Sequence, residues 1–251
     1  MTIFYFTATG NSLAVAKSIG GTLVSIPQVI DSDDLHYIDD AIGVVFPIYR
    51  LAEPKMVRRF LDKAKFEADY LFAIGTYGNM SGAAMWNVQK QALKNGYHFH
   101  YVNDLLMVDN YLPMFEIDKQ IARLPEKDTA QMTDKIANDI RKRKLMYAKA
   151  TPASRTLTAV LDFAMPKNKN APRYIVDDKC VTCGICAQVC PAHNITVSDK
   201  VNFDNNCEQC YACIHLCPHN AIHLKNEKSN KRWRNPNVSL SEIIDANNRG
   251  M

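Results

Sequence analysis

Over residues 1–115, short apolar runs alternate with longer amphipathic stretches. The apolar runs are rich in β-branched and aromatic residues and predict five buried strands: Thr2–Thr7, Thr22–Ile26, Ala41–Ile48, Tyr70–Thr76 and His98–Val108. Helices are expected between them, at Gly10–Ile19, Glu53–Ala64 and Ser81–Asn95. Residues 26–41 are expected to form a loop or a short helix. This alternation predicts a doubly wound α/β domain, a parallel five-stranded sheet with helices on both faces.

All eight cysteines lie in two copies of one motif, C-x-x-C-x-x-C-x-x-x-C-P, near the C-terminus. This spacing carries 4Fe–4S clusters in bacterial two-cluster ferredoxins, where the fourth cysteine of each run ligates the other cluster. The expected ligand sets are Cys180, Cys183, Cys186 and Cys217 for one cluster, and Cys207, Cys210, Cys213 and Cys190 for the other. Zinc is a weaker alternative, since it needs only two cysteine pairs. A disulfide framework is weaker still, because the N-terminus shows no secretory signal.

The two motifs belong to a longer internal repeat. A shift of 27 residues superposes Cys180 on Cys207 and Ile195 on Ile222. We therefore expect a small pseudo-twofold α+β ferredoxin module, held together by its clusters because so small a core cannot fold on apolar burial alone. Four nearby histidines are interpreted as surface residues or N–H donors near sulfur, not as ligands: His193, His215, His219 and His223.

The loop Thr7–Ser12, between the first strand and the first helix, has the composition of a phosphate site. Hydroxyl side chains, a glycine and free N–H groups at a helix N-terminus favour an anion. The loop lacks the Gly-Lys-Ser/Thr ending of a Walker motif and the G-x-G-x-x-G dinucleotide fingerprint. The structural alternative is a capped helix with Thr9 at or near the N-cap.

This loop resembles the FMN-phosphate loop of flavodoxins. The resemblance implies side-chain contacts to the phosphate from Thr7, Thr9, Asn11 and Ser12, and backbone N–H contacts from Ala8 and Gly10. It also implies that two further loops, Pro47–Pro54 and Thr76–Gly82, wrap the isoalloxazine ring. The candidate ring residues are Pro47, Tyr49, Arg50, Thr76, Tyr77, Gly78, Asn79, Gly82 and, from outside these loops, Tyr111, the three tyrosines being candidates to stack on the ring. With the cysteine motifs and the tail Lys231–Pro236, nearly the whole chain resembles the ferrodoxin family of flavodoxin–ferredoxin fusions.

The second of these loops departs from the flavodoxin pattern. Flavodoxins often place a glycine there, at a peptide that flips when the flavin is reduced, whereas this chain has Arg50-Leu51-Ala52. Because a residue with a Cβ resists positive φ, such a flip is not expected. Arg50 is instead a candidate to favour the anionic reduced flavin, or alternatively a surface arginine paired with Glu53.

Residues 116–172 have a weaker pattern. A helix is expected at Asp128–Tyr147, with one face formed by Met132, Ile136, Ile140 and Tyr147. Its basic run Arg141–Lys144 is either a solvated face or a docking patch for an acidic redox partner. A short helix, Leu157–Met165, is expected to pack between the two halves, with membrane-surface binding the less favoured reading. Lys167–Pro172 is expected to be a linker, which gives domains at 1–150 and 173–251, joined by 151–172.

The expected function is transfer of electrons between two 4Fe–4S clusters and one FMN, which couples one-electron and two-electron partners. With no acid–base triad and no nicotinamide fingerprint, we expect the partners to be other redox proteins. The alternative is a flavin-dependent reductase of a small-molecule acceptor, with residues 108–125 as a pocket wall. In a third hypothesis, the N-terminal half has lost its flavin and only binds a partner.

The formal net charge of +4 at first suggests a nucleic-acid partner. Two oxidised clusters would add about −4 and a flavin phosphate about −2, so the loaded protein would carry about −2. Nucleic acid is therefore not an expected partner. There is no apolar run of eighteen or more residues, so no membrane span is expected. The oxygen sensitivity of 4Fe–4S clusters favours a reducing cytoplasm.

Overall fold

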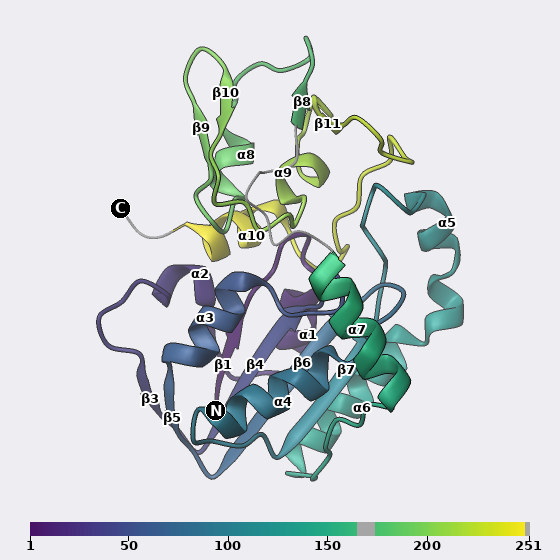
Figure 1. Cartoon of the computed structure of the whole chain (residues 1–251). Coiled ribbons are helices and arrows are strands. Elements are labelled where there is room, and N and C mark those ends of the chain that lie inside the picture. The colour runs from purple at the N-terminus through teal and green to yellow at the C-terminus, as the bar shows by residue number, and fades with distance from the viewer. Residues whose placement is uncertain (165–173, 249–251) are drawn as a thin grey trace.

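The computed structural model describes residues 1–164 and 174–248. Its N-terminal part is built on a parallel sheet with the strand order β2-β1-β4-β6-β7 (Figure 1). The five strands are β1 (Thr2–Tyr5), β2 (Thr22–Ser25), β4 (Ala41–Pro47), β6 (Tyr70–Tyr77) and β7 (Tyr101–Leu106). This is the flavodoxin-like order, whose topological switch point lies between β1 and β4. The predicted doubly wound fold is confirmed, although the fifth strand begins at Tyr101 and not at His98.

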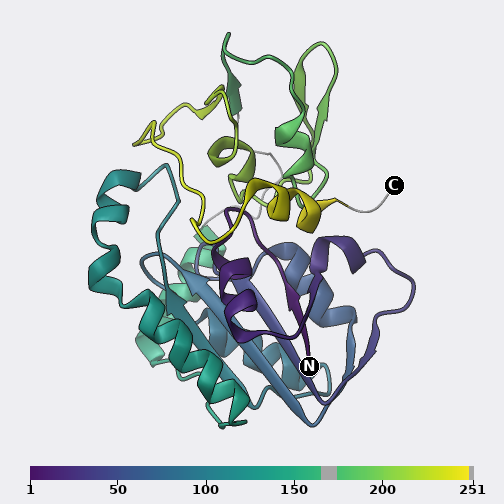
Figure 2. The same ribbon diagram turned by 180° about the vertical axis from the view of Figure 1, so that it is seen from behind.

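Helices cover both faces of the sheet (Figures 1 and 2). One face carries α1 (Asn11–Ile19) and α6 (Thr129–Arg141), and the other carries α3 (Lys55–Lys63) and α4 (Ala84–Lys94). The central strands β4 and β6 are buried along nearly their whole length, as expected for a sheet covered on both sides. Gly43 is required in β4, because a Cβ there would lie 2.0 Å from the Phe72 ring. Burial of a side chain such as Phe72 contributes about 1.5–3 kcal/mol.

Short elements near the sheet were only partly predicted. Residues 26–41 contain the expected short helix, α2 (Ile26–Val29), and also β3 (His36–Ile38), which pairs in parallel with β5 (Lys65–Glu67). Each of these two strands has only three residues, and most of them are exposed. Such strands leave no periodic signal in a sequence.

The segment after β7 differs most from expectation. It contains α5 (Ile117–Ala122) and a 3₁₀ turn, Leu124–Lys127, before α6. Helix α6 ends at Arg141, six residues earlier than predicted. The chain then turns at Arg143, where φ is 49°, and Met146 runs beside β7. Tyr147 is therefore not on the helix.

Helix α7 (Pro152–Ala164) is longer than predicted and lies beside α4 (Figure 1). The buried Thr158 hydroxyl accepts a hydrogen bond from the Ala83 N–H at 3.0 Å, whereas Leu157 and Val160 are exposed. Leu157 and Val160 therefore lie on the flank of the α/β domain, whereas Leu161 of the same helix lines a cavity beside residues 207–211 of the C-terminal half. The expected linker Lys167–Pro172 lies outside the described residues. Within the described residues, no helix is long and apolar enough to cross a membrane.

The C-terminal part is a small module with two antiparallel strand pairs. One pair is β9 (Ile195–Val197) with β10 (Val201–Phe203), and the other is β8 (Tyr174–Val176) with β11 (Ile222–Leu224). Each cysteine motif contains one short helix, α8 (Ile185–Gln188) or α9 (Ala212–His215). The predicted repeat of loop, turn and strand is therefore present. After β11 the chain returns to the α/β domain and ends in α10 (Leu240–Asn247), beside α2 (Figure 2).

Candidate functional site

A cavity of about 430 Å³ lies at the carboxyl edge of the sheet, where β1, β4 and β6 end. In such folds ligands bind at this edge, by the switch point. The loop after β1 contributes Thr7, Ala8, Thr9, Asn11 and Ser12 to the lining. The two predicted ring loops contribute Pro47, Tyr49, Arg50, Thr76, Tyr77, Gly78 and Asn79, and Tyr111 lines the same cavity. Of the residues proposed for a flavin, Gly10 and Gly82 alone are not part of the lining.

The wall opposite these loops comes from the second cysteine motif, at residues 207–211. Sequence reasoning did not anticipate this, because it treated the two halves separately. Another part of the lining comes from residues 108–115, the segment suggested as a pocket wall. Its members are Val108, Asp109, Asn110, Tyr111, Met114 and Phe115.

In the loop after β1, polar groups are aimed at one another and at the cavity. Ser12 Oγ lies 2.8 Å from Thr76 Oγ1, and the Asn110 amide donates to Thr9 Oγ1 at 2.7 Å. Thr7 Oγ1 is buried and has no hydrogen-bond partner among the described residues. Leaving a buried hydroxyl unpaired costs about 1–3 kcal/mol, so this atom indicates a missing ligand group.

Helix α1 begins without a side-chain cap. Its N-cap is Gly10, with φ 96°, and no side chain bonds the first turn, so the alternative of a Thr9 cap is wrong. The first N–H groups of the helix therefore remain available to an anion. Gly10 itself faces the C-terminal tail, since a Cβ there would lie 3.0 Å from the Cβ of Val238.

Asn11 is bound mainly by other parts of the protein. Its Oδ1 accepts from Trp233 Nε1 at 3.3 Å and from Asn235 Nδ2 at 3.1 Å, while its amide donates to the Val108 carbonyl at 3.3 Å. In addition, the Asn235 N–H donates to the Thr9 carbonyl at 2.8 Å. In the sequence, the tail contributed only to the family resemblance. Contacts between residues more than 220 positions apart leave no local pattern.

The loop after β4 contradicts the expectation about positive φ. Arg50 and Leu51 have φ of 50° and 62°, and they form the centre of a tight turn in which Tyr49 and Ala52 exchange two backbone hydrogen bonds. Two successive left-handed residues without a glycine cost on the order of 1–2 kcal/mol each. Such strain in a loop that lines a cavity is typical of functional sites.

The alternative pairing of Arg50 with Glu53 is not formed. The buried Glu53 carboxylate is paired with Arg58, and its Oε2 has no partner among the described residues. Arg50 lines the cavity instead. The loop thus presents one cation and one unpartnered carboxylate oxygen.

Behind the loop after β6 lies a buried lysine that sequence reasoning missed. Lys127 Nζ donates to the Gly78 carbonyl at 3.0 Å and also to the Met107 carbonyl. Burial lowers the pKa of this ammonium, and burial raises the pKa of the neighbouring Asp109 carboxyl. Gly78 cannot carry a side chain, because a Cβ would lie 2.3 Å from Asp109 Cα. Lys127 therefore holds the backbone of two loops of the cavity.

All three tyrosines proposed for ring stacking line the cavity, and Tyr211 of the second motif joins them. The Tyr111 and Tyr211 rings are 5.8 Å apart between centroids. Burial, and then the neighbouring Cys210 and Glu208, raise the pKa of Tyr49 well above its ordinary value. The cavity thus has aromatic side chains from both halves of the chain.

Glu208, between Cys207 and Cys210, joins the two halves. Its carboxylate accepts from the N–H groups of Lys55 and Met56, each at 3.0 Å, at the start of α3. A carboxylate at a helix N-terminus satisfies free donors and interacts favourably with the helix dipole. Burial raises the pKa of this carboxyl. The loop that carries Cys207 and Cys210 is therefore fastened to the α/β domain beside the cavity.

The structure gathers the cysteines in the two sets expected from the crossed ligand pattern. One small cavity is lined by Cys180, Cys183, Cys186 and Cys217. The other is lined by Cys190, Cys207, Cys210 and Cys213. In the described parts of the chain, no three Cys, His, Asp or Glu side chains are arranged to hold a single metal ion.

Hydrogen bonding and burial both act on the cysteine sulfurs. Backbone N–H groups donate to sulfur in both sets, from Asn194 to Cys190 at 3.3 Å and from Ala221 to Cys217 at 3.4 Å. Burial raises the pKa of Cys186 to about 11 and raises that of Cys210 well above its ordinary value. Without a metal such buried thiols stay protonated, whereas a bound cation deprotonates its thiol ligands.

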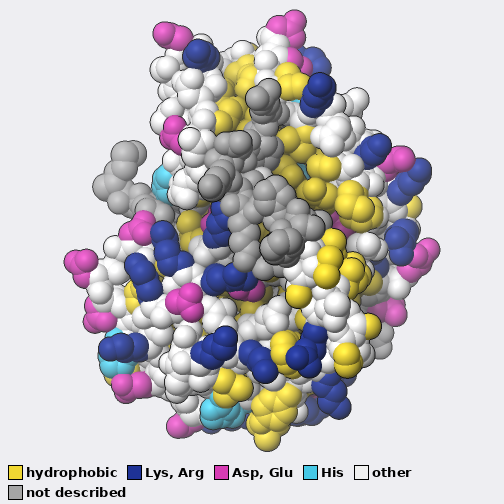
Figure 3. Space-filling view, in the orientation of Figure 1, with side chains coloured by type: hydrophobic (Ala, Val, Ile, Leu, Met, Phe, Trp, Pro, Cys, Tyr) yellow, Lys and Arg dark blue, Asp and Glu magenta, His cyan; other side chains and the backbone are white. Residues whose placement is uncertain are grey.

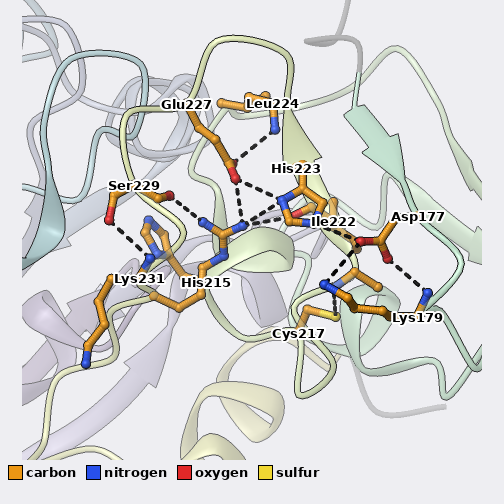
Figure 4. A network of polar contacts seen from close by, with 12 residues as sticks. Asp177, Lys179, His215, Cys217, Ile222, His223, Leu224, Glu227, Ser229 and Lys231 are labelled. Atoms are coloured by element: carbon orange, nitrogen blue, oxygen red, sulfur yellow. Dashed lines mark hydrogen bonds and ion pairs between the residues drawn. The ribbon is translucent and has the colours of Figure 1, made fainter.

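Of the four histidines near the motifs, His215 and His223 differ from the interpretation as surface residues, whereas His193 is exposed as expected. His215 is only 5% exposed, and burial lowers its pKa to about 4. His223 lies between Glu227 and Asp177, at 2.8 and 3.3 Å (Figure 4). His219 is exposed, as expected.

The basic run 141–144 lies at the opposite edge of the sheet from the cavity. Arg143 pairs with Asp40, just before β4, and the Lys144 carbonyl accepts from the Tyr70 hydroxyl at the start of β6. On the face shown in Figure 3, cationic and anionic side chains are interspersed over the α/β domain. The run therefore lies at the edge of the sheet opposite the cavity lined by Cys207 and Cys210.

Residues 173–196 match the family model described as "4Fe-4S binding domain". No curated protein matches the chain. The chain thus combines a flavodoxin-like α/β domain, assigned from its strand order, with a 4Fe–4S binding domain.

The similar solved structures each cover between 41% and 55% of this chain. A putative flavoprotein from Bacteroides uniformis is 18% identical, with 42% of this chain and 89% of that chain covered and a TM-score of 0.32. The two-electron reduced flavodoxin of Megasphaera elsdenii is 19% identical, with 41% and 83% covered and a TM-score of 0.30. An azoreductase from Bacillus anthracis is 11% identical, with 55% and 99% covered and a TM-score of 0.35.

Proposed function

We propose that this protein transfers electrons between two 4Fe–4S clusters and an FMN bound in the cavity at the carboxyl edge of the sheet. One observation carries the proposal: residues of the phosphate-type loop and residues of the second cysteine motif line the same cavity. A cluster held by Cys207 and Cys210 would then border the flavin site directly, and no second protein is needed between the two centres.

The residues present fit an FMN. The uncapped start of α1 and the unpaired Thr7 hydroxyl would hold its phosphate with neutral donors. The unpaired oxygen of Glu53 could accept a hydrogen bond from a donor on the ring, and Arg50 supplies a cation in the same cavity. Tyrosines from both halves provide flat apolar walls.

The cysteines fit two clusters. Each set of four surrounds its own cavity, and the backbone N–H groups that donate to sulfur stabilise negative charge there. When bound, FMN carries one or two electrons and each 4Fe–4S cluster carries one, which suits a converter between one-electron and two-electron partners. The protein's part is to hold these groups at fixed separation.

The redox partner is proposed to dock at the first cysteine set. Cys183 is exposed, with the exposed Val181 beside it, whereas Cys186 is buried. None of the four cysteines of this set lines the flavin cavity, whereas Cys207 and Cys210 of the other set do, so an electron would enter or leave at the first set. An exposed cluster ligand also suits a reducing compartment such as the cytoplasm.

The alternative is reduction of a small molecule over the flavin. The wall formed by Tyr111, Met114 and Phe115 supports it, because these side chains would bound a substrate site. However, a cavity of about 430 Å³ is near the lower limit for a single organic ligand, which favours the carrier.

The test is to measure iron, sulfide and FMN in protein purified without oxygen. The proposal predicts about eight irons, about eight sulfides and one FMN per chain. Full iron without flavin, persisting after FMN is added back, would show that the α/β domain serves only for docking. Steady turnover of a small acceptor in the absence of any partner protein would favour the reductase.

A further inference from the structure

In the sequence, His215 lies between a cysteine of one proposed cluster and a cysteine of the other. It lies on α9, two residues after Cys213 of one set and two residues before Cys217 of the other. Its side chain is buried, although the cysteines complete both ligand sets without it. A buried imidazole needs hydrogen-bond partners, and those of His215 lie outside the cysteine motifs.

Both ring nitrogens are bonded to the backbone. Nε2 lies 2.8 Å from the Asn110 carbonyl, and Nδ1 lies 3.2 Å from the Trp233 N–H. A carbonyl can only accept and a backbone N–H can only donate, so these two contacts determine the tautomer. His215 is a neutral imidazole that donates from Nε2 and accepts at Nδ1.

The first partner leads to the phosphate-type loop. Asn110, whose carbonyl accepts from His215, donates its side-chain amide to Thr9 Oγ1 at 2.7 Å. His215 and Thr9 are therefore linked through a single residue, although they belong to different domains.

The second partner leads to the same loop by another route. The Trp233 indole N–H donates to Asn11 Oδ1 at 3.3 Å, and that oxygen also accepts from Asn235 at 3.1 Å. Asn235 in turn donates its N–H to the Thr9 carbonyl at 2.8 Å. The two routes form one closed ring of hydrogen bonds between α9 and the start of α1.

We propose that His215 is a positioning residue that couples occupation of the phosphate loop to the geometry of the iron–sulfur module. This inference rests on the proposed function. A phosphate that orders Thr9 and Asn11 also orders Asn110 and Trp233, which bond the two sides of the imidazole. By linkage, the coupling is reciprocal: the assembled clusters, which order α9, tighten FMN binding.

The experiment uses the full chain with both clusters, stripped of flavin and titrated with FMN. Three variants separate the two contacts. His215→Phe removes both, His215→Gln keeps a donor near the Nε2 position, and His215→Asn keeps an acceptor near the Nδ1 position. His98→Phe, at an exposed site at the other end of the α/β domain, is the matched control for the substitution. Trp233→Phe keeps the backbone N–H to His215 but lacks the indole donor, and it serves if His215→Phe does not fold.

Two readouts are needed, the FMN dissociation constant and the change in the EPR spectrum of the reduced clusters when FMN is added. We expect His215→Phe to weaken FMN binding about tenfold and to abolish the FMN-dependent spectral change. The Gln, Asn and Trp233→Phe variants should each weaken binding about threefold, and His98→Phe should match the wild type. If the role of His215 is purely structural, His215→Phe will lower the stability of the protein but will keep the spectral change on FMN addition.

The experiment distinguishes a failure of the His215 coupling from a failure of the proposed function. If the wild type binds FMN and His215→Phe binds it equally well with an unchanged spectral response, the coupling is refuted while the proposed function stands. If His215→Phe does not fold, the coupling is refuted when Trp233→Phe and His215→Gln both match the wild type in FMN affinity and in the spectral response. If the wild type does not bind FMN, the proposed function itself fails.

Discussion

Among single residues, Thr7 carries the clearest sign of a ligand, because its buried hydroxyl has no partner among the described residues. Thr7→Val removes the hydroxyl but keeps the shape of the side chain. We expect the flavin-free protein to unfold with a free energy within about 0.5 kcal/mol of the wild type, since no hydrogen bond is lost. FMN affinity should fall about tenfold. The check is chemical denaturation without flavin, together with FMN titration; equal affinity for both proteins would remove Thr7 from the site.

Position 10 requires glycine for two reasons, its positive φ and the closeness of the C-terminal tail. Gly10→Ala would adopt φ 96° with a Cβ 3.0 Å from Val238 and 3.1 Å from Asn235. The matched control is Gly96→Ala, where φ is 86° and no atom lies within 4 Å of the added Cβ. We expect Gly96→Ala to cost about 1 kcal/mol of stability and Gly10→Ala clearly more. Only Gly10→Ala should also weaken FMN binding. A thermal melt and an FMN titration of both variants decide this, and indistinguishable results would mean that the tail does not bear on the loop.

At this scale, the sequence revealed residues whose chemistry depends on spacing. The eight cysteines and the Thr7–Ser12 loop were recognisable because their residue types recur at short, regular separations. His215 and Lys127 were not. Their roles come from carbonyl groups at least 20 residues away, Met107 and Gly78 for Lys127 and Asn110 for His215. A buried histidine and an exposed one look alike in a sequence.

Among the elements, the Tyr49–Ala52 turn is the least expected. It places Arg50 at the cavity with φ 50° and leaves Glu53 to pair with Arg58. With FMN bound in the cavity as proposed, a cation there would stabilise the anionic reduced flavin, so removal of the charge should make the FMN midpoint potential more negative. We expect a shift of about 20–40 mV for Arg50→Gln, since about 30 mV corresponds to about 1.4 kcal/mol in a two-electron couple. Arg50→Lys keeps the charge and should stay near the wild-type value in a redox titration. A positive shift for Arg50→Gln would contradict this role.

Helix α3 is capped from the other domain by Glu208. Glu208→Ala removes the acceptor for two N–H groups, whereas Glu208→Gln keeps an acceptor oxygen in place. Hydrogen exchange at Lys55 and Met56 should become at least about tenfold faster in the Ala variant and much less so in the Gln variant. The amides of strand β4, in the sheet of the same domain, serve as an internal reference. Unchanged exchange at Lys55 and Met56 in Glu208→Ala would show that the two domains are not joined here.

Elements were predicted well where one periodicity runs over many residues. The strands β1, β4 and β6 are buried on both faces and appear in the sequence as continuous apolar runs. The end of α6 was misjudged, because the chain turns just after it, at Arg143, in a left-handed conformation that non-glycine residues seldom adopt. The short strands β3 and β5 carry no periodic signal.

In the whole molecule, the ferredoxin module and the C-terminal tail close the flavodoxin-like domain at the carboxyl edge of its sheet (Figure 2). The tail ends in α10, where Lys17 pairs with Glu242 at 2.5 Å and the Asn247 amide donates to the Val189 carbonyl at 3.0 Å. One helix therefore contacts both domains. The two domains were each predictable from the sequence, but their shared cavity was not, because it depends on contacts between segments that are more than 100 residues apart.

The central claim is that electrons pass between the cysteine-bound clusters and the flavin inside one chain. The most direct measurement is stopped-flow reduction of the loaded protein with less dithionite than its total capacity, followed by absorbance as the electrons redistribute between clusters and flavin. Cys207 and Cys210 line the same cavity as the loops after β1, β4 and β6. This arrangement predicts a redistribution rate that is independent of protein concentration. A rate that rises in proportion to protein concentration would mean that electrons pass between molecules, and would contradict the account.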